Sequence, residues 1–313
     1  MSFKIVGIGE VLWDLLPAGP QLGGAPANFA CHAHALGASA SVITRIGQDQ
    51  LGRAIIDRFQ QLDFSTEMIQ VDPGLPTGTV SVTLNGDGIP HYVIHENAAW
   101  DRIELTDFST IKVCQANAIC FGSLSQRTKP AAVVIQQLVA ATSAKTLRVF
   151  DVNLRQAFYT QDVIEKSLDL ANVLKLNDHE LAVLAAMFGL PGAVKPQMEF
   201  LAGRFGLRLV ALTRGDQGSL LYEAGNWSDL PGSSVQIVDT VGAGDSFTAA
   251  LVMGLLGGMP LDQLHRAAAE IADFVCSQPG ATPALPEHFR AKFFSQCSPA
   301  QTATSVAESV PVK

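Results

Sequence analysis

Short apolar runs of β-type residues alternate with helical patterns through most of this chain of 313 residues. Their period and length predict strands at residues 4–8, 40–46, 116–121, 147–151, 173–176 and 209–213. Helical patterns lie between them, at residues 26–36, 50–62, 129–141, 163–171, 178–188 and 198–205. This alternation predicts an α/β fold in which a central, mostly parallel sheet is flanked by helices on both faces. Ligands of such folds bind at the carboxyl ends of the strands.

Two segments interrupt the alternation. Residues 11–16 follow the first predicted strand almost directly, and residues 77–84 and 91–95 flank the hairpin-turn sequence Asn85-Gly-Asp-Gly88. We expect them to form a small antiparallel sheet that projects from the main one. This sheet would act as a lid over a binding site, drawn from residues 11–16 and 77–100. A hairpin without function is the alternative.

The predicted lid strands carry apolar residues on both faces. These residues are Val80, Val82, Tyr92 and Ile94. Their exposure would favour a homodimer formed through the lid. We assign residues 1–294 to one domain. The tail at residues 295–313 is rich in Ser, Thr, Ala, Pro and Val without helical period, so we expect it to be disordered.

Composition argues against several classes of partner. The chain is 48% hydrophobic and 16% charged, with a formal net charge of −8, so we expect no nucleic-acid partner. The apolar stretch at residues 247–259 is too short and too interrupted by glycine to span a membrane. Five cysteines without a CxxC pair are typical of buried free thiols in a reducing cytoplasm. The absence of a signal-peptide pattern also favours a cytoplasmic protein.

The sequence Asp239-Thr-Val-Gly-Ala-Gly-Asp245-Ser-Phe247 joins an apolar run at residues 235–238, which predicts a strand, to a helical pattern. The amides of Gly242, Ala243 and Gly244 open this helix, where amides lack carbonyl partners and the helix dipole favours an anion. Asp245 lies in the same turn, and its charge would repel a resident phosphate. Its presence is explained if it removes a proton while the amides stabilise a transferring phosphoryl group.

Near the start, Gly23-Gly24-Ala-Pro26-Ala-Asn28 is typical of a helix start, because glycine allows close backbone approach and proline suits the first turn. Asn28 can donate and accept hydrogen bonds one turn into this helix. Asp14 interrupts the apolar run Val-Leu-Trp-Asp-Leu-Leu. It either ends a solvated strand or accepts hydrogen bonds from sugar hydroxyls. Taken alone, the glycines favour small-residue packing over a ligand site.

Two further strands end in polar residues. Asp151-Val-Asn153-Leu-Arg155 follows the fourth main strand, where it either contacts a ligand or forms a structural ion pair. Asn177-Asp-His-Glu180 closes the next strand, with the spacing of an N-cap and a capping box. The alternative places Asn177 and Glu180 near a hydrated Mg²⁺ ion, which keeps several waters and needs few protein ligands. Capping is the better explanation of this motif alone.

Another strand ends in Thr213-Arg-Gly215-Asp-Gln-Gly218-Ser219. Its glycines either let backbone amides approach a phosphate or form a tight hairpin turn. No Walker A sequence occurs, which excludes P-loop chemistry, and Gly242-Ala-Gly244 lacks the third glycine of a dinucleotide fingerprint. The histidines at positions 32, 34, 91 and 95 lack convincing metal-site spacing.

The order of these motifs resembles that of the ribokinase-like (PfkB) carbohydrate kinases. Gly-Gly-x-Pro-x-Asn, Asp-x-Asn-x-Arg, Asn-x-x-Glu, Thr-Arg-Gly-x-x-Gly and Asp-Thr-Val-Gly-Ala-Gly-Asp-Ser-Phe follow one another, and the resemblance covers residues 3–290. The last motif is highly specific for that family. The resemblance implies a ribokinase-like fold with a small β-sheet lid, ATP and Mg²⁺ as cofactors, and transfer of the γ-phosphoryl group to a sugar hydroxyl.

By position in these motifs, the resemblance implies roles for individual residues. Asp245 corresponds to the catalytic base, and Gly242, Ala243 and Gly244 correspond to the anion hole. The sugar contacts correspond to Asp14, Gly24 and Asn28, with Arg155 reaching a sugar hydroxyl or the transferring phosphate. The nucleotide site corresponds to Asn177, Thr213, Gly215, Gly218 and Gly244, and the water-mediated Mg²⁺ contacts to Asn177 and Glu180.

Members of this family often bind a monovalent cation beside the anion hole. The corresponding residues are Asp239 and Val241 in one loop and Gln278 and Gly280 in another. Ala284 stands where many relatives have serine, so a backbone carbonyl would have to complete a K⁺ site here.

The substrate is indicated by two segments. Gly9-Glu-Val-Leu-Trp-Asp14-Leu-Leu-Pro17 and the Asp151 motif resemble fructokinases within the family. A 2-keto-3-deoxygluconate kinase would need more cationic groups for its substrate's carboxylate, for which Arg102 is a candidate. Ribokinase is a further alternative, although the Asp-x-Asn-x-Arg strand end is not its usual pattern. A non-catalytic sugar- or nucleotide-binding regulator is the non-enzyme alternative, against which Asp245 and its glycine turn speak.

Overall fold

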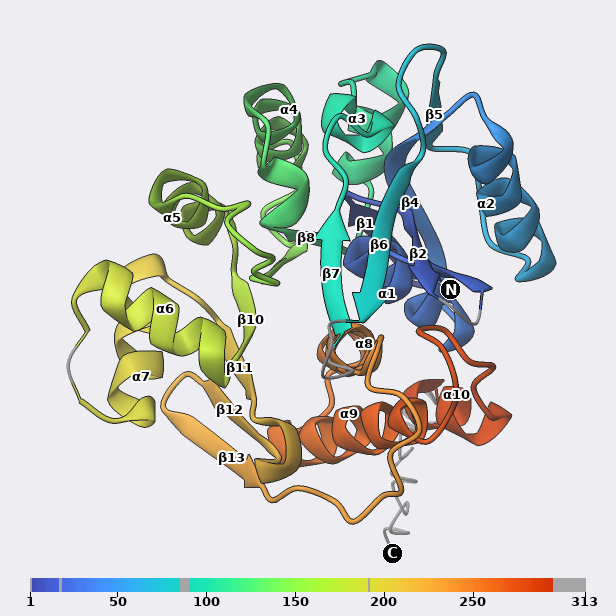
Figure 1. The fold of residues 1–313 in the computed structure, drawn as a ribbon. Coiled ribbons are helices and arrows are strands. Elements are labelled where there is room, and N and C mark those ends of the chain that lie inside the picture. The colour runs from blue at the N-terminus through green and yellow to red at the C-terminus, as the bar shows by residue number, and fades with distance from the viewer. Residues whose placement is uncertain (1, 17–18, 85–89, 191, 295–313) are drawn as a thin grey trace, which may run out of the picture.

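A nine-stranded sheet forms the centre of the molecule. The computed structural model describes residues 2–16, 19–84, 90–190 and 192–294, and within them the strand order is β13-β12-β11-β10-β9-β8-β1-β4-β5 (Figure 1). The strands are β1 (Lys4–Ile8), β4 (Ser39–Gly47), β5 (Ile69–Asp72), β8 (Ala118–Gly122), β9 (Leu147–Asp151), β10 (Val173–Asn177), β11 (Leu209–Thr213), β12 (Ser219–Glu223) and β13 (Asn226–Leu230). Neighbours from β11 to β5 pair in parallel, whereas β12 and β13 are antiparallel.

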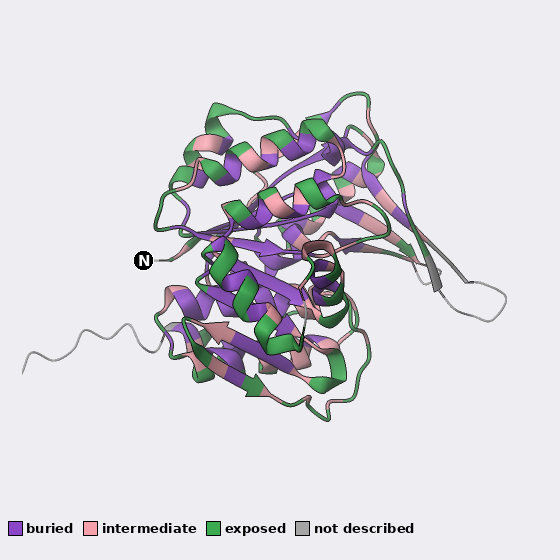
Figure 2. Cartoon of the chain, turned by 90° about the vertical axis from the view of Figure 1, so that its left-hand side faces the viewer, coloured by how far each residue is buried: buried purple, intermediate pink, exposed green. Residues whose placement is uncertain are grey.

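Helices cover both faces of this sheet. One apolar core contains residues of α1 (Ala25–Ala35), α2 (Gln50–Gln61), α8 (Ala243–Leu256), α9 (Leu261–Cys276) and α10 (Glu287–Phe294). The other contains residues of α3 (Asp107–Cys114), α4 (Lys129–Ala140), α5 (Gln161–Leu170), α6 (Asp178–Phe188) and α7 (Val194–Phe205). Successive strand side chains point to opposite faces, so Val149 belongs to the first core and Phe150 to the second. Figure 2 shows the buried strands between helices with exposed outer faces. The predicted α/β fold is confirmed.

Four short strands form a second, smaller sheet. They are β2 (Leu12–Leu16), β3 (Gly19–Gly23), β6 (Gly78–Leu84) and β7 (Pro90–Ile94), in the order β3-β2-β6-β7. The outer pairs are antiparallel as predicted, whereas β2 and β6 pair in parallel. Parallel pairing is possible because a long crossover through α1 and β4 connects these two strands. The predicted turn at residues 85–88 and the tail at residues 295–313 lie outside the described residues.

Part of the expected dimer surface is covered by the chain itself. Val80 and Ile94 pair across β6 and β7 and belong to the same buried core as Trp100. Tyr92 is 49% exposed, and the Val82 side chain falls outside the described ones. Leu15 and Val93 of the same sheet are also exposed, at 38% and 39%, so apolar surface stays open on the small sheet although Val80 and Ile94 do not contribute to it.

Two sequence predictions were wrong. Residues 235–238 form a loop rather than a strand, because the amides of Val238 and Asp239 donate to the Cys276 carbonyl at the end of α9. Cys114 is exposed on α3, whereas Cys31 and Cys120 are buried free thiols as predicted. Within the described ranges, no helix has the length and apolarity needed to cross a membrane.

The second core contains a stacked aromatic pair whose contribution to stability can be measured. Phe121 and Phe150 are both 0% exposed, and their ring centroids are 5.4 Å apart. We expect Phe150→Ala to lower the free energy of unfolding by about 3–5 kcal/mol, because it removes buried area and leaves a cavity. Phe200→Ala on α7, where the side chain is 46% exposed, is the matched control and should change it by about 0.5 kcal/mol or less. Urea unfolding followed by circular dichroism measures both, and equal losses would contradict this core assignment.

Candidate active site

A glycine turn opens α8. Gly242 caps the helix with a φ of 81°, a left-handed conformation that favours glycine. A Cβ at this position would lie 2.1 Å from the Ala281 carbonyl oxygen, so no side chain fits. The Ala243 amide donates to the Thr240 carbonyl at 3.3 Å, whereas the Gly242 and Gly244 amides have no acceptor in the described part of the chain. Two of the three amides predicted to hold an anion are therefore available for one.

Asp245 lies in the same helical turn, where α8 meets α1. Its Oδ2 accepts a hydrogen bond from Nδ2 of Asn28 at 2.9 Å. Burial, assisted by the negative charge of Asp151, raises the pKa of Asp245 to about 6. A carboxyl group with this pKa is ionised at neutral pH and still basic enough to take a proton. The structure thus brings together Asn28 and Asp245, which belong to widely separated motifs.

The start of α1 allows close backbone approach. Gly24 caps this helix with a φ of 110°, and a Cβ there would lie 2.4 Å from the Glu10 carbonyl oxygen. Asn28 is buried, and its Oδ1 has no partner among the residues described. An unsatisfied buried oxygen costs free energy, which a hydroxyl donor would recover. The structure therefore shows tight small-residue packing at Gly24, while the sugar contact of Gly24 and Asn28 stays a prediction.

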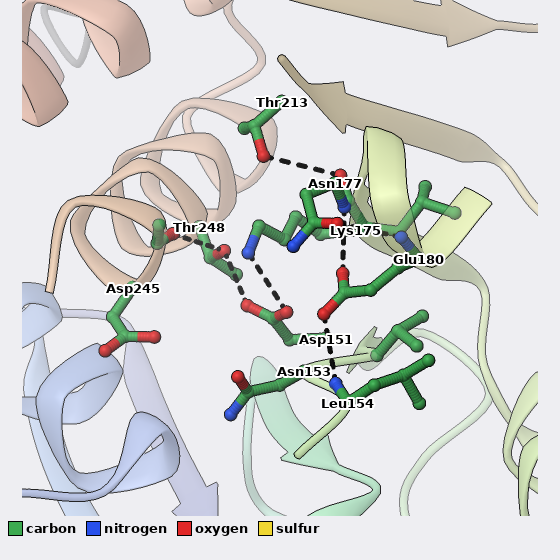
Figure 3. A network of polar contacts seen from close by, with 12 residues as sticks. Asp151, Asn153, Leu154, Lys175, Asn177, Glu180, Thr213, Asp245 and Thr248 are labelled. Carbon is green, nitrogen blue, oxygen red and sulfur yellow. Dashed lines mark hydrogen bonds and ion pairs between the residues drawn. The ribbon is translucent and has the colours of Figure 1, made fainter. Parts of the chain in front are cut away.

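Beside the glycine turn, three side chains form a buried polar network (Figure 3). The Lys175 Nζ lies 3.1 Å from Asp151 Oδ1, and the Thr248 hydroxyl donates to Asp151 Oδ2 at 3.2 Å. These residues come from β10, β9 and α8, so the network ties α8 to the sheet. The structural ion pair considered for the Asp151 motif exists, and its cation is Lys175 of the neighbouring strand. Sequence reasoning missed Lys175, whose only signal is a lone lysine inside an apolar strand.

Asn177 and Glu180 form the predicted capping box at the start of α6. The Glu180 amide donates to Asn177 Oδ1 and the Asn177 amide donates to Glu180 Oε2, both at 2.8 Å. Glu180 Oε1 accepts a third hydrogen bond, from the Leu154 amide at 3.0 Å. In the described residues, no group of three or more His, Cys, Asp or Glu side chains could hold a metal ion. Asn177 and Glu180 therefore do not belong to a site in which protein side chains alone coordinate the metal. They fit a hydrated Mg²⁺ ion that is held mainly by a nucleotide's phosphates.

Arg155 is an exposed cation whose charge reaches three carboxyl groups. Burial raises the pKa of Glu10 to about 7 and that of Asp14 to about 6, and the Arg155 charge opposes the shift in both. Asp245 is the third of these carboxyl groups. Glu10 is buried with Oε2 unpartnered among the described residues, and sequence reasoning did not single it out. The region around Arg155 therefore contains more acidic than basic groups.

The loop that presents Arg155 has an unusual backbone. Asn153 and Gln156 have φ values of 42° and 49°, a left-handed conformation that is uncommon for residues other than glycine. Such conformations cost free energy and occur often at functional sites. Among the contacts that hold the start of the loop, the Leu154 amide donates to Glu180, and the Ser123 hydroxyl donates to the Val152 carbonyl at 2.7 Å.

Residues 213–219 form the tight hairpin considered from the sequence. The Arg214 amide donates to the Gly218 carbonyl at 2.8 Å, with Gly215 in the 3₁₀ turn η3 (Gly215–Gln217) between β11 and β12. Gly218 has a φ of 85°, and a Cβ there would lie 2.1 Å from the Leu230 carbonyl oxygen. Thr213 pairs with Asn177 in the parallel register of β10 and β11. The structure thus places Thr213 beside the capping box, and the phosphate contact of this hairpin stays a prediction.

Asp239 links the two loops predicted to bind a monovalent cation. Its Oδ1 accepts from the Val241 amide at 3.0 Å, and its Oδ2 accepts from the Gly280 amide at 3.1 Å. Nearby, the buried His32 Nε2 lies 2.9 Å from the Ala281 carbonyl oxygen. Asp239 therefore braces the loop before α8, and the K⁺ site of Asp239, Val241, Gln278 and Gly280 stays a prediction.

Several known proteins are similar in sequence to this chain. The model of the pfkB family carbohydrate kinases matches residues 20–288. A putative sugar kinase, PH1459 of Pyrococcus horikoshii, is 30% identical over 83% of this chain and 85% of its own. Fructokinase-1 of Zea mays is 27% identical over 90% of this chain and 94% of its own. Probable fructokinase-5 of Arabidopsis thaliana is 29% identical with the same two coverages.

Solved structures give the same result for the fold. The crystal structure of the Pyrococcus horikoshii sugar kinase PH1459 superposes with a TM-score of 0.79 at 28% identity, covering 89% of this chain and 93% of that one. A fructokinase with bound ATP from Xylella fastidiosa superposes with a TM-score of 0.81 at 22% identity, covering 95% of this chain and 100% of that one. Because the family model matches most of the chain, at residues 20–288, the chain belongs to the pfkB family of carbohydrate kinases.

Proposed function

We propose that this protein is an ATP-dependent kinase that transfers the γ-phosphoryl group to a hydroxyl of a neutral hexose, with fructose as the first candidate. The observation that carries this proposal is the contact between Asn28 and Asp245 at the start of α8. The Asp245 carboxyl group, whose pKa is raised, lies in the same helical turn as the free amides of Gly242 and Gly244, and Asn28 holds it there. A proton acceptor next to an anion site is the arrangement that phosphoryl transfer to an alcohol requires.

In the proposed reaction, Asp14, Gly24 and Asn28 hold the sugar. Asp245 accepts the proton of the reacting hydroxyl as its oxygen bonds to the γ-phosphorus, and the bond from phosphorus to the β,γ-bridging oxygen breaks to release ADP. The amides of the α8 turn stabilise the negative charge on the transferring group. The small sheet closes over the site as a lid and excludes water, which would otherwise compete as the acceptor.

The nucleotide side of the site is proposed from three segments. Thr213, Gly215 and Gly218 of the hairpin contact the phosphates of ATP, near the capping box of Asn177 and Glu180. Mg²⁺, when bound, would neutralise phosphate charge and be held through water by Asn177 and Glu180. A Mg²⁺ complex with ATP is named for one fold neighbour, a putative ribokinase II from E. coli. We further propose that K⁺ binds between the Asp239 and Gly280 loops and that copies of the chain pair through the small sheet.

The charges of the acceptor side favour a neutral sugar. Arg155 is outnumbered by Glu10, Asp14 and Asp245, the three carboxyl groups that its charge reaches. The charge of Arg102 acts on Asp72 at the end of β5 instead. A substrate carboxylate, as in 2-keto-3-deoxygluconate, would meet like charges, whereas sugar hydroxyls can donate hydrogen bonds to these carboxylates.

Fructose is the first candidate because several relatives at 27–29% identity carry the name fructokinase and match over most of both chains. A 2-dehydro-3-deoxygluconokinase from Thermotoga maritima has the same fold, with a TM-score of 0.80 at 19% identity. 2-Keto-3-deoxygluconate and ribose therefore remain the alternative substrates. A regulator that binds sugar or nucleotide without turnover is the non-enzyme alternative.

Replacing the proposed base tests the mechanism. We expect Asp245→Asn to leave the fold intact and to lower kcat by at least ~10²-fold, since the variant cannot accept the hydroxyl proton. Asp57→Asn, at an exposed position of α2, is the matched control and should keep kcat within about twofold. ADP release coupled to a dehydrogenase measures both, with circular dichroism to confirm folding. Near wild-type turnover of Asp245→Asn would remove Asp245 from the mechanism.

The raised pKa of Asp245 makes two pH predictions. Because the base must be ionised, kcat/KM of the wild type should fall as the pH drops below about 6. The folded carboxyl also binds its proton more tightly than the unfolded one, so stability is lost as the pH rises from the unfolded pKa through the folded one, and the loss is complete above the folded pKa. Asp245→Asn should therefore raise the thermal midpoint at pH 8 and have a smaller effect at pH 4.5. A variant that is no more stable than the wild type at pH 8 would contradict the burial of this charge.

A substrate panel distinguishes the alternatives. We expect ADP release with fructose to exceed that with ribose, 2-keto-3-deoxygluconate, adenosine and inosine by at least ~10-fold in kcat/KM. A preference for 2-keto-3-deoxygluconate would contradict the charge argument. Sugar binding measured by calorimetry, without turnover of any of the five, would identify a regulator.

A further inference from the structure

The Lys175 side chain reaches from the sheet to the glycine turn of α8. Lys175 lies in the middle of β10 and pairs in register with Asp151 on β9. A Cβ built on Gly244 would lie 2.9 Å from Lys175 Nζ and 3.7 Å from its Cε. The ammonium group therefore occupies the space beside Gly244 that a side chain would need. Figure 3 shows Lys175 between Asp151 and the first turn of α8, which carries Asp245.

The Lys175 side chain is 9% exposed and that of its partner Asp151 is 6% exposed. In the described residues, the Nζ donates to one acceptor, Asp151 Oδ1. An ammonium group has three donors, so two remain unused beside the anion site.

A purely structural role explains this arrangement less well. Buried ion pairs add little net stability, because removing both charges from water costs about as much as their attraction returns. The pair of Asp151 and Lys175 instead holds a positive charge in a fixed position, next to the helix turn at which Asp245 lies. A fixed positive charge at this position acts on whatever negative group enters the turn.

We propose that Lys175 is a further catalytic residue of this chain, whose ammonium group donates hydrogen bonds to the non-bridging oxygens of the phosphoryl group as it moves from ATP to the sugar. Asp151 holds Lys175 in place and is a positioning residue. The inference rests on the proposed kinase function. In this proposal the anion site has two kinds of donor, the backbone amides of Gly242 and Gly244 and the ammonium group of Lys175.

Three variants separate the catalytic role from a structural one. Lys175→Met should lower kcat by at least ~10²-fold, as expected for the loss of one transition-state donor, and should also lower the thermal midpoint because Asp151 is left buried and unpaired. The double variant Lys175→Met with Asp151→Asn removes both charges, so it should recover thermal stability without recovering kcat. Recovery of kcat to within about threefold of wild type in the double variant would overturn the proposal. Lys166→Met on α5, where the side chain is 54% exposed, is the matched lysine control and should leave kcat unchanged.

Nucleotide binding gives a test that is independent of turnover. Calorimetry with ADP and with the non-hydrolysable ATP analogue AMP-PNP should show that Lys175→Met weakens binding of AMP-PNP at least ~10-fold and leaves that of ADP within about twofold. An equal loss for both nucleotides, or no loss for either, would overturn the proposal. If the wild type phosphorylates no sugar, the proposed function fails, whereas a selective loss of AMP-PNP binding would still identify Lys175 as the ligand of the γ-phosphate.

Discussion

The close approach of the α8 turn to its neighbours is the constraint on which the rest of the site depends. At Gly242 the turn packs against the Ala281 carbonyl, and at Gly244 it packs against the Lys175 ammonium group. A side chain at position 242 would push the helix away from the Ala281 backbone, and one at position 244 would displace the Lys175 ammonium group. Because both positions carry glycine, which has no side chain, the first turn lies against the sheet, and Asp245 reaches Asn28 on α1. One local feature therefore sets the positions of the anion site and of the proposed base together.

The charges around this turn are divided between two sides. On the acceptor side, the charge of Arg155 acts on Glu10, Asp14 and Asp245, and burial raises the pKa of all three carboxyl groups. On the sheet side, Lys175 is fixed by Asp151. A neutral polyol suits the first environment, because it can donate hydrogen bonds without adding charge. A phosphoryl group suits the boundary between the two, where backbone amides and an ammonium group converge.

Local sequence signals predicted most of the fold and part of the site. The strands at residues 4–8, 147–151 and 209–213 were predicted with their observed bounds, because each is a short apolar run with clear boundaries. Strands β12 and β13, at one end of the main sheet, and β5, at its other edge, were missed because their apolar runs are interrupted or flanked by polar residues. Asp245 and Asn28 were found because glycine and proline mark the turns beside them. Lys175 was missed because its meaning depends on Asp151, which lies 24 residues away and meets it only through strand pairing.

The central claim is that this site moves a phosphoryl group from ATP onto a sugar hydroxyl. Phosphorus NMR of the wild-type protein with Mg²⁺, ATP and fructose tests it most directly. The account predicts that the γ-phosphate signal of ATP disappears while signals of ADP and of a fructose phosphate monoester grow in equal amounts, and that Asp245→Asn abolishes this conversion. Release of inorganic phosphate without a sugar ester, or an ester formed equally well by Asp245→Asn, would contradict it.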